Sequence, residues 1–178
     1  MNREQWWAVV SLMEDIKALI ERQRGLDEVR VAIRGKLAQI RRHLGATLAE
    51  AEVFKLLFPL VIYCDELMLR HLADQDPTKW PLLQAELYQI RDGGEALYRL
   101  LDDELEKPEM SAALAEVLYY CLNDGFVGRL SGEPLKMKEY QERLAGRIQA
   151  RAKKLGGVAL ADGAAVGASA IDGKRRRG

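Results

Sequence analysis

The chain has 178 residues, enough for one domain with a single core or for two small packed lobes. Its 27 lysines and arginines balance 27 aspartates and glutamates, which argues against a global electrostatic attraction to nucleic acid or to an anionic membrane. The two cysteines, Cys64 and Cys121, each sit inside an apolar run. We expect buried free thiols, although spacing alone leaves a disulfide open.

Apolar residues recur at helical spacing along most of the chain, and no useful stretch alternates as a strand does. The pattern predicts an all-α fold of about seven helices in two packed lobes. Glycines and prolines mark most of the boundaries. The expected helices lie before Gly25, between Gly25 and Gly45, from the Thr47–Glu50 capping box to about His71 with a kink at Pro59, from Pro81 to Ile90, from Glu95 to Pro108, from a Ser111 cap to Gly125, and from Pro134 to Gly156.

The composition changes after residue 155. Residues 156–178 are rich in glycine and alanine and end in the basic cluster Lys-Arg-Arg-Arg-Gly. Such a segment buries too little apolar surface to offset the entropy of ordering. We therefore divide the chain into a helical domain, residues 1–155, and a flexible C-terminal tail, residues 156–178.

Recognisable catalytic and cofactor motifs are missing from the sequence. It contains no phosphate-binding glycine loop, no Cys-x-x-Cys pair and no Glu-x-x-His pair, so we expect neither a metal nor a cofactor. Asp65 and Glu66 are adjacent, and adjacent residues point about 100° apart on a helix. They therefore do not converge on one substrate atom. We expect one carboxylate at the helix surface and the other bonded to a neighbouring element.

Two glycine-containing segments interrupt the helical pattern. In Asp92-Gly93-Gly94-Glu95 we expect a tight helix–helix turn that uses positive φ and an acidic cap. In residues 121–130, CLNDGFVGRL, Gly125 and Gly128 are expected to provide a left-handed helix stop and a point of close backbone approach. Phe126 is then a buried plug. Arg129 is expected to satisfy free carbonyls or pair with a carboxylate, with Asp65 or Glu66 as the candidate partner.

Several stretches together resemble one family. VIYCDELML, Trp80, GGEALYRLLD and LAEVLYYCLNDGFVGRL fall in the order and spacing typical of the DotU/TssL (IcmH/DotU) family of type VI secretion system inner-membrane proteins. The most specific element is the apolar helix that ends in Gly-Phe-x-Gly-Arg. The resemblance covers roughly residues 1–155. Its motif positions in this sequence include Asp65, Glu66, Trp80, Gly94, Glu95, Gly125, Phe126, Gly128 and Arg129.

The resemblance implies a cytoplasmic domain of two three-helix bundles joined in a hook, with a cleft between them. It implies a non-enzymatic scaffold at the cytoplasmic face of the bacterial inner membrane, which binds an IcmF/TssM-like inner-membrane protein and baseplate proteins and possesses a capacity for self-association. The family usually carries a transmembrane helix after this domain, and none is present here. Either the sequence was cut before that helix or this member lacks it. The basic end is typical of the cytoplasmic flank of such a helix, so we expect the first of these.

The sequence also leaves two other function classes open. One is a stand-alone helical adaptor or ligand-binding regulator, and the other is an enzyme that uses Asp65 and Glu66. Under the scaffold interpretation, the acidic loop 73–81 is the candidate partner-binding surface, because Asp74 and Asp76 would steer a partner and Trp80 would anchor it. An ordinary solvated loop with Trp80 in the core explains the same residues equally well.

Overall fold

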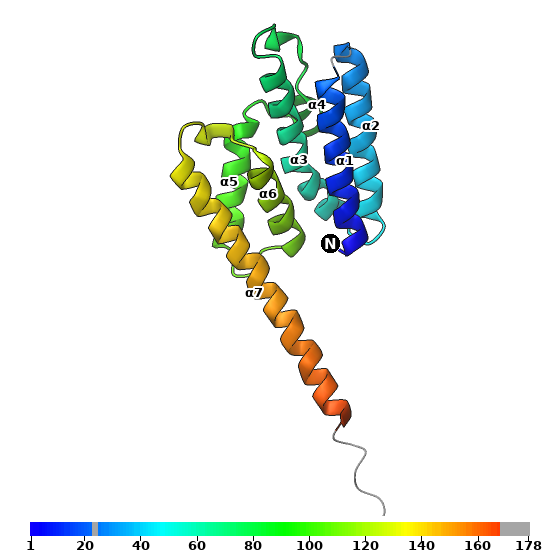
Figure 1. Ribbon diagram of the computed structural model, residues 1–178, viewed down its shortest axis with the longest axis vertical. Helices are drawn as coiled ribbons and strands as arrows, with labels where there is room; N and C mark the ends of the chain where they lie inside the picture. The colour runs from blue at the N-terminus through cyan, green and yellow to red at the C-terminus, as the bar shows by residue number, and fades with distance from the viewer. Residues whose placement is uncertain (23–24, 168–178) are drawn as a thin grey trace, which may run out of the picture.

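The computed structural model describes residues 1–22 and 25–167, and the side chains of residues 1–22 and 25–156. Within these residues the protein is built from α-helices and two short 3₁₀ turns, without a strand, which confirms the all-α prediction (Figure 1). The elements are α1 (Arg3–Glu21), α2 (Leu26–Gly45), α3 (Glu50–His71), η1 (Pro77–Lys79), α4 (Leu83–Tyr88), α5 (Gly93–Glu106), α6 (Ala112–Asp124), η2 (Gly128–Leu130) and α7 (Pro134–Gly167).

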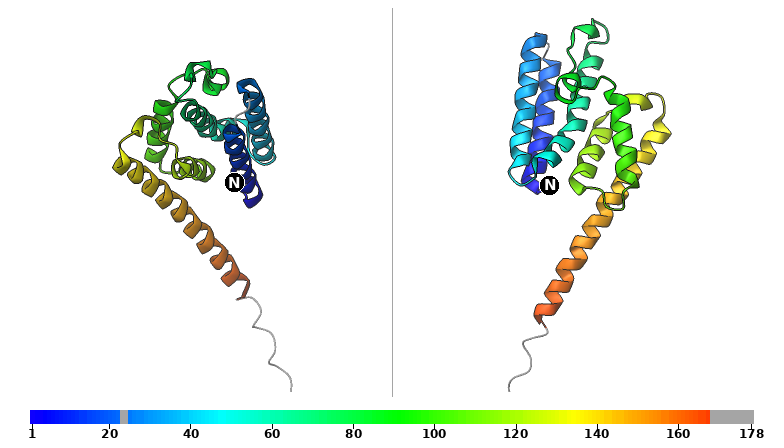
Figure 2. Two further views of the ribbon diagram at one scale, coloured as in Figure 1. Left: turned by 45° about the horizontal axis from the view of Figure 1, so that its top comes forward. Right: turned by 180° about the vertical axis from the view of Figure 1, so that it is seen from behind.

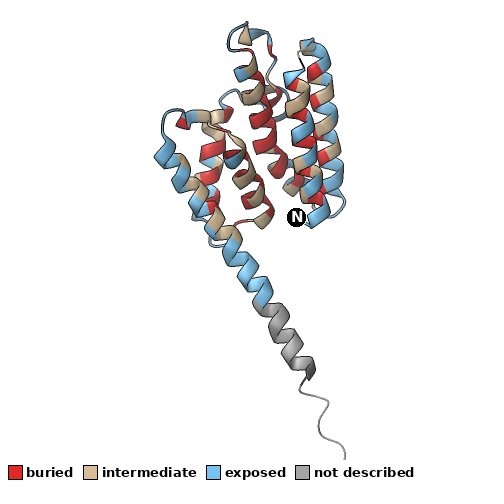
Figure 3. Ribbon diagram, in the orientation of Figure 1, coloured by how far each residue is buried: buried red, intermediate tan, exposed pale blue. Residues whose placement is uncertain are grey.

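Helix α3 is the centre of the molecule. It packs against α1 and α2 on one side and against α5 and α6 on the other, and α7 lies along α6 (Figures 1 and 2). Because α3 is covered on both sides, its sequence is apolar nearly all round, and Leu56, Leu60 and Cys64 are fully buried. Figure 3 shows this buried centre between more exposed outer helices. The α1–α3 and α5–α7 bundles therefore share one core.

Helix α7 runs from the body out beyond it. Leu144 is buried and Ile148 is half-buried, whereas residues 149–156 are exposed (Figures 1 and 3). The predicted end at Gly156 is wrong, because α7 continues to Gly167. Each of the two glycines, Gly156 and Gly157, costs only about 1 kcal/mol relative to alanine inside a helix, and valine, alanine and leucine follow them. The last part of the predicted flexible tail, residues 168–178, lies outside the described residues.

The start of α3 differs from the prediction. No side chain caps this helix, whose N-cap is Ala49. Thr47 instead accepts a hydrogen bond of 2.7 Å from the amide of Gln5, which also reaches the carbonyl of His43 at 3.0 Å. Gln5 is buried and also forms a capping box with Asn2 at the start of α1. The capping box thus belongs to α1, and the Thr47 side chain ties α1 to the end of α2.

Helix α3 contains Pro59 and continues to His71, as predicted. The boundaries of the next helix differ from the prediction. Pro81 precedes α4 by two residues instead of starting it, and α4 ends at Tyr88, where Gln89 adopts a left-handed conformation with φ of 58°. The predicted fourth helix therefore loses two residues at each end, and α4 is only six residues long.

Candidate functional site

Asp65 is completely buried in α3, where its carboxylate holds the N-terminus of α4. One oxygen accepts from Trp80 Nε1 at 2.8 Å and from the backbone N–H of Leu83 at 2.9 Å, and the other accepts from the N–H of Gln84 at 2.9 Å. Helix α4 has no capping side chain of its own. Asp65 supplies that cap from another helix, which also explains why α4 begins at Leu83.

Gln84 carries the connection on to α5. Its side-chain carbonyl accepts from the N–H of Gly93 at 2.6 Å, and Gln84 is 5% exposed. A Cβ placed on Gly93 would lie 2.3 Å from that same oxygen. A larger residue at position 93 would thus displace the Gln84 side chain from its hydrogen bond. Neither Gly93 nor Gly94 has a positive φ, so the predicted glycine turn is wrong in its mechanism. The predicted cap is wrong too, because the Asp92 carboxylate pairs with Arg99 at 2.6 Å instead of bonding a backbone N–H.

Glu66 holds the segment that follows α6, residues 125–129, here called the glycine turn. Its two oxygens accept from the N–H groups of Val127 at 2.9 Å and Gly128 at 2.7 Å. Arg70, one helical turn along α3, donates to Glu66 at 2.7 Å and to the carbonyl of Gly125 at 2.9 Å. Asp65 and Glu66 thus point to different neighbours of α3, and both bond elements distant in sequence.

The glycine turn is shaped by two left-handed glycines around a buried ring. Gly125, with φ of 112°, ends α6, and Phe126 is 1% exposed, as predicted. Gly128 has φ of 54°, and a Cβ there would lie 2.8 Å from the Phe126 ring and 2.9 Å from the carbonyl of Gly94. A Cβ on Gly94 would in turn lie 3.2 Å from Gly128 Cα. The backbones of α5 and the turn touch directly, which the two glycines make possible.

Arg129 does not pair with Asp65 or Glu66, so that prediction is wrong. Its guanidinium binds Glu95 at 2.7 Å and Asp102 at 3.4 Å on α5, and it lies over the ring of Tyr98 at 5.2 Å. Asp65 is completely buried, and Glu66 is already bonded to two backbone N–H groups and to Arg70, whereas the Arg129 side chain lies along α5. The broader prediction, that Arg129 pairs with a carboxylate, is confirmed.

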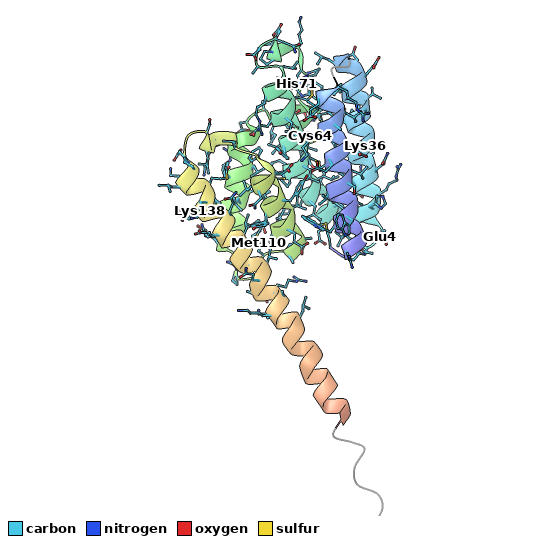
Figure 4. The ribbon with its side chains drawn as sticks, in the orientation of Figure 1. Glu4, Lys36, Cys64, His71, Met110 and Lys138 are labelled. Atoms are coloured by element: carbon cyan, nitrogen blue, oxygen red, sulfur yellow. The ribbon has the colours of Figure 1, made fainter. Side chains whose placement is uncertain are left out.

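The arrangement offers little for catalysis. Burial raises the pKa of the Cys64 and Cys121 thiols, which disfavours the nucleophilic thiolate. Both cysteines are free and buried, and Figure 4 shows Cys64 inside the helical body. Burial and the nearby Asp124 likewise raise the pKa of Tyr63, whose hydroxyl donates to the Asp124 carbonyl at 2.7 Å. In the described part of the chain, no cluster of histidine, cysteine, aspartate and glutamate has the composition of a metal site.

The loop after α3 separates its three predicted residues. Asp74 is exposed, whereas Asp76 is half-buried and caps η1 by accepting from the N–H of Thr78 at 3.1 Å. Hydrogen bonds from the hydroxyl and the N–H of Thr78 also hold the pKa of the Asp76 carboxyl below its usual range. Trp80 is 3% exposed and belongs to the core. Of these three predicted residues, only Asp74 has a side chain available to a partner without disturbing the fold.

Three residues of this network were not singled out from the sequence. Gln84 and Arg70 are described above, and the Tyr98 hydroxyl donates to the carbonyl of Val127 at 2.9 Å. Arg70 follows Glu66 by four residues, a spacing that favours an ion pair on a helix. Tyr98 lies inside the quoted GGEALYRLLD stretch. Nothing in the local sequence marks Gln84, because its partner Gly93 lies in the next helix.

The model of the family described as type VI secretion system protein DotU matches residues 7–177. The chain belongs to the DotU family. A solved DotU structure from Francisella novicida has the same fold, with a TM-score of 0.64 and 21% sequence identity over 77% of this chain and 95% of that chain. No curated protein matches the sequence. Membership of the DotU family gives the chain a role in type VI secretion.

Among the residues that the structure describes, no helix is long and apolar enough to cross a membrane. The longest, α7, carries charged residues throughout its visible side chains, including Arg151, Lys153 and Lys154.

Proposed function

We propose that the chain is a non-enzymatic scaffold of a type VI secretion membrane complex. In this role it binds an IcmF/TssM-like inner-membrane protein and baseplate proteins at the cytoplasmic face of the inner membrane. Family membership supports the secretion role. The observation that carries the scaffold assignment is the use of the Asp65 and Glu66 carboxylates, which are both bonded to backbone N–H groups of neighbouring elements. These bonds stiffen the body and leave no convergent acid–base pair.

Rigidity matters for such a role because a partner surface that is already ordered loses less entropy on binding. The glycine turn, α4 and the start of α5 are all held from α3, so the loops between the helices have fixed positions. The projecting half of α7 then places a basic helix away from the body, with Arg151, Lys153 and Lys154 exposed. These features suit a platform that contacts several partners at once.

The test is a pull-down of the cognate IcmF/TssM-like cytoplasmic domain and of baseplate proteins. Wild type is compared with Asp74→Lys/Asp76→Asn, because asparagine keeps the cap on η1 while the charge of the loop is reversed. The matched control is Glu106→Gln/Glu109→Lys, the same charge change at exposed positions at the end of α5.

We expect wild type and control to retain at least one partner and the loop variant to lose it. If wild type binds none of these partners, the proposed function is wrong. If the folded loop variant binds every partner as wild type does, the acidic loop is not the docking surface, and the scaffold assignment is unaffected.

A further inference from the structure

A surface groove lies between α2, α3 and α4, away from the carboxylate network. Its apolar wall includes Phe54, Leu57, Val61, Leu87 and Tyr88, which define the α2–α4 groove. The cavity measures about 380 Å³. Phe54 is 55% exposed and Leu87 is 41% exposed, although both are large apolar side chains. Exposed apolar side chains gathered in a hollow mark a binding surface more often than scattered ones do.

The groove exists because α4 is short. Helix α4 covers one stretch of the α2–α3 surface and ends at Tyr88, where Gln89 turns away in a left-handed conformation. The neighbouring stretch along Phe54 has no described helix of this chain over it. Figure 2 shows α4 as a short piece beside the much longer α2 and α3. One further helix laid beside α4 would cover the exposed apolar side chains.

The wall of the groove is ordered before any partner arrives. The Tyr88 hydroxyl donates to the carbonyl of Phe54 at 2.8 Å. The Tyr88 ring packs against Phe54 at 4.5 Å and against Phe58 at 5.0 Å between ring centroids. Aromatic side chains held in this way provide contact area at a low entropic cost, which favours them as anchors in interfaces.

The charges at the rim select the kind of partner. Arg34 and Arg41 line the groove from α2, seven residues and so about two turns apart on one face. Each is more than half exposed, and each pairs with a surface carboxylate, Glu86 at 3.1 Å and Glu50 respectively. Surface pairs of this kind contribute little and exchange readily for others. Arg30 also pairs with Glu86, so three arginines face two carboxylates.

We propose that the α2–α4 groove binds an amphipathic helix of another protein, with an apolar stripe flanked by acidic residues. The stripe fills the groove over Phe54 and Leu87, and carboxylates two turns apart meet Arg34 and Arg41. The projecting half of α7 from a second copy is a poor occupant, because residues 149–156 carry three cations and no carboxylate. This proposal rests on the scaffold role and names the chemistry of one docking partner.

The first test uses defined probes and does not depend on the identity of the natural partner. Two helical peptides of about 18 residues, five turns, carry the same leucine stripe flanked by glutamates or by lysines. We expect the acidic peptide to bind wild type more tightly than the basic one. We expect Phe54→Ser/Leu87→Ser and Arg34→Glu/Arg41→Glu each to weaken it roughly tenfold or more.

Matched controls lie outside the groove. Val31→Ser removes an apolar side chain that is 71% exposed, and Lys136→Glu/Lys138→Glu reverses two exposed charges on α7. Both are expected to bind the acidic peptide as wild type does. The proposal is overturned if the acidic peptide does not bind wild type, or if the folded groove variants bind it unchanged.

The second test uses the cognate IcmF/TssM-like and baseplate proteins and the same variants. Loss of one partner from the groove variants alone supports the proposal. Equal binding by wild type and groove variants overturns it while the scaffold role stands. A change in the oligomeric state of Phe54→Ser/Leu87→Ser in the absence of partner also overturns it, because a second copy would then cover the groove. If wild type binds neither protein, the scaffold role fails and the peptide result alone decides the groove.

Discussion

The two halves of α3 present opposite surfaces. At its C-terminal half, Asp65 and Glu66 are bonded to backbone N–H groups, and the neighbouring glycines are packed against other atoms. At its N-terminal half, Phe54 is more than half exposed beside the α2–α4 groove. One helix thus combines a polar network that is satisfied inside the protein with an apolar surface that is not. Polar residues in a distinctive motif can serve the fold, whereas the exposed apolar side chains are the better candidates for binding.

Asp65→Ala is expected to have the largest effect on stability. The substitution leaves Trp80 Nε1 and the N–H groups of Leu83 and Gln84 buried without an acceptor. Since one unsatisfied buried donor costs about 1–3 kcal/mol, we expect a loss of roughly 3–5 kcal/mol in the free energy of unfolding. Urea denaturation measures it. Asp74→Ala, at an exposed position, is the control and is expected to stay within about 0.5 kcal/mol of wild type.

Gly128→Ala is expected to have the next largest effect. A Cβ there meets the Phe126 ring at 2.8 Å and the Gly94 carbonyl at 2.9 Å, and φ is positive. Gly132→Ala is a matched control, because Gly132 also has positive φ but nothing lies within 4 Å of its added Cβ. We expect about 1–2 kcal/mol for the control and roughly 2–4 kcal/mol for Gly128→Ala by thermal or urea unfolding. Equal losses would mean that the glycine turn yields to a side chain and is not tightly packed.

Arg129→Ala is expected to cost less, about 1 kcal/mol in unfolding free energy. Its side chain is 32% exposed and its partners Glu95 and Asp102 are each 43% exposed, so solvent screens the ion pairs. The stacking over Tyr98 adds part of the effect. A double-mutant cycle with Glu95→Ala separates the pair from the stacking. A loss of unfolding free energy as large as that of Asp65→Ala would show that Arg129 also stabilises the buried network of Asp65 and Glu66.

Phe54→Ser, in the exposed apolar wall of the groove, is expected to have the smallest effect on stability. Because the ring is 55% exposed, we expect a loss of less than about 1 kcal/mol in unfolding free energy. Chemical denaturation of the isolated protein gives the value. Phe126→Ser is the contrast, since that ring is 1% exposed and its removal is expected to cost roughly 3–5 kcal/mol. If the two losses were similar, Phe54 would be a core residue and the groove would have no spare apolar surface.

Much of the fold follows from local patterns in the sequence. Helical spacing of apolar residues predicts the all-α fold, and Ser111 and Gly125 act as the expected N-cap and left-handed C-cap of α6. These succeed because the cause and the effect lie within a few residues of each other. Gly156 and Gly157 did not end α7, because each glycine disfavours a helix interior by only about 1 kcal/mol and the residues that follow are again compatible with helix.

The contacts of the site were harder to predict, because they join residues far apart in sequence. The carboxylates of Asp65 and Glu66 bond N–H groups about 18 and 61 residues away, which no local spacing indicates. The Thr47 hydroxyl likewise accepts a hydrogen bond from Gln5, 42 residues away, and does not cap α3, the helix that follows it. The resemblance to DotU proteins drew attention to Asp65, Glu66 and the glycines, but the partners of these residues required the packed structure. The α2–α4 groove was not predicted, because its hollow results from the early end of α4.

Amide hydrogen exchange, with and without a saturating cognate partner domain, tests the central claim most directly. The claim is that the Asp65 and Glu66 network serves the fold while the partner binds elsewhere. We predict that the amides of Leu83, Gln84, Val127 and Gly128 exchange slowly in the free protein and do not change on binding. Amides at the end of α4, around Tyr88, are expected to slow when the partner is added. Fast exchange at Val127 and Gly128 that slows only with the partner would contradict the account and make the glycine turn part of the interface.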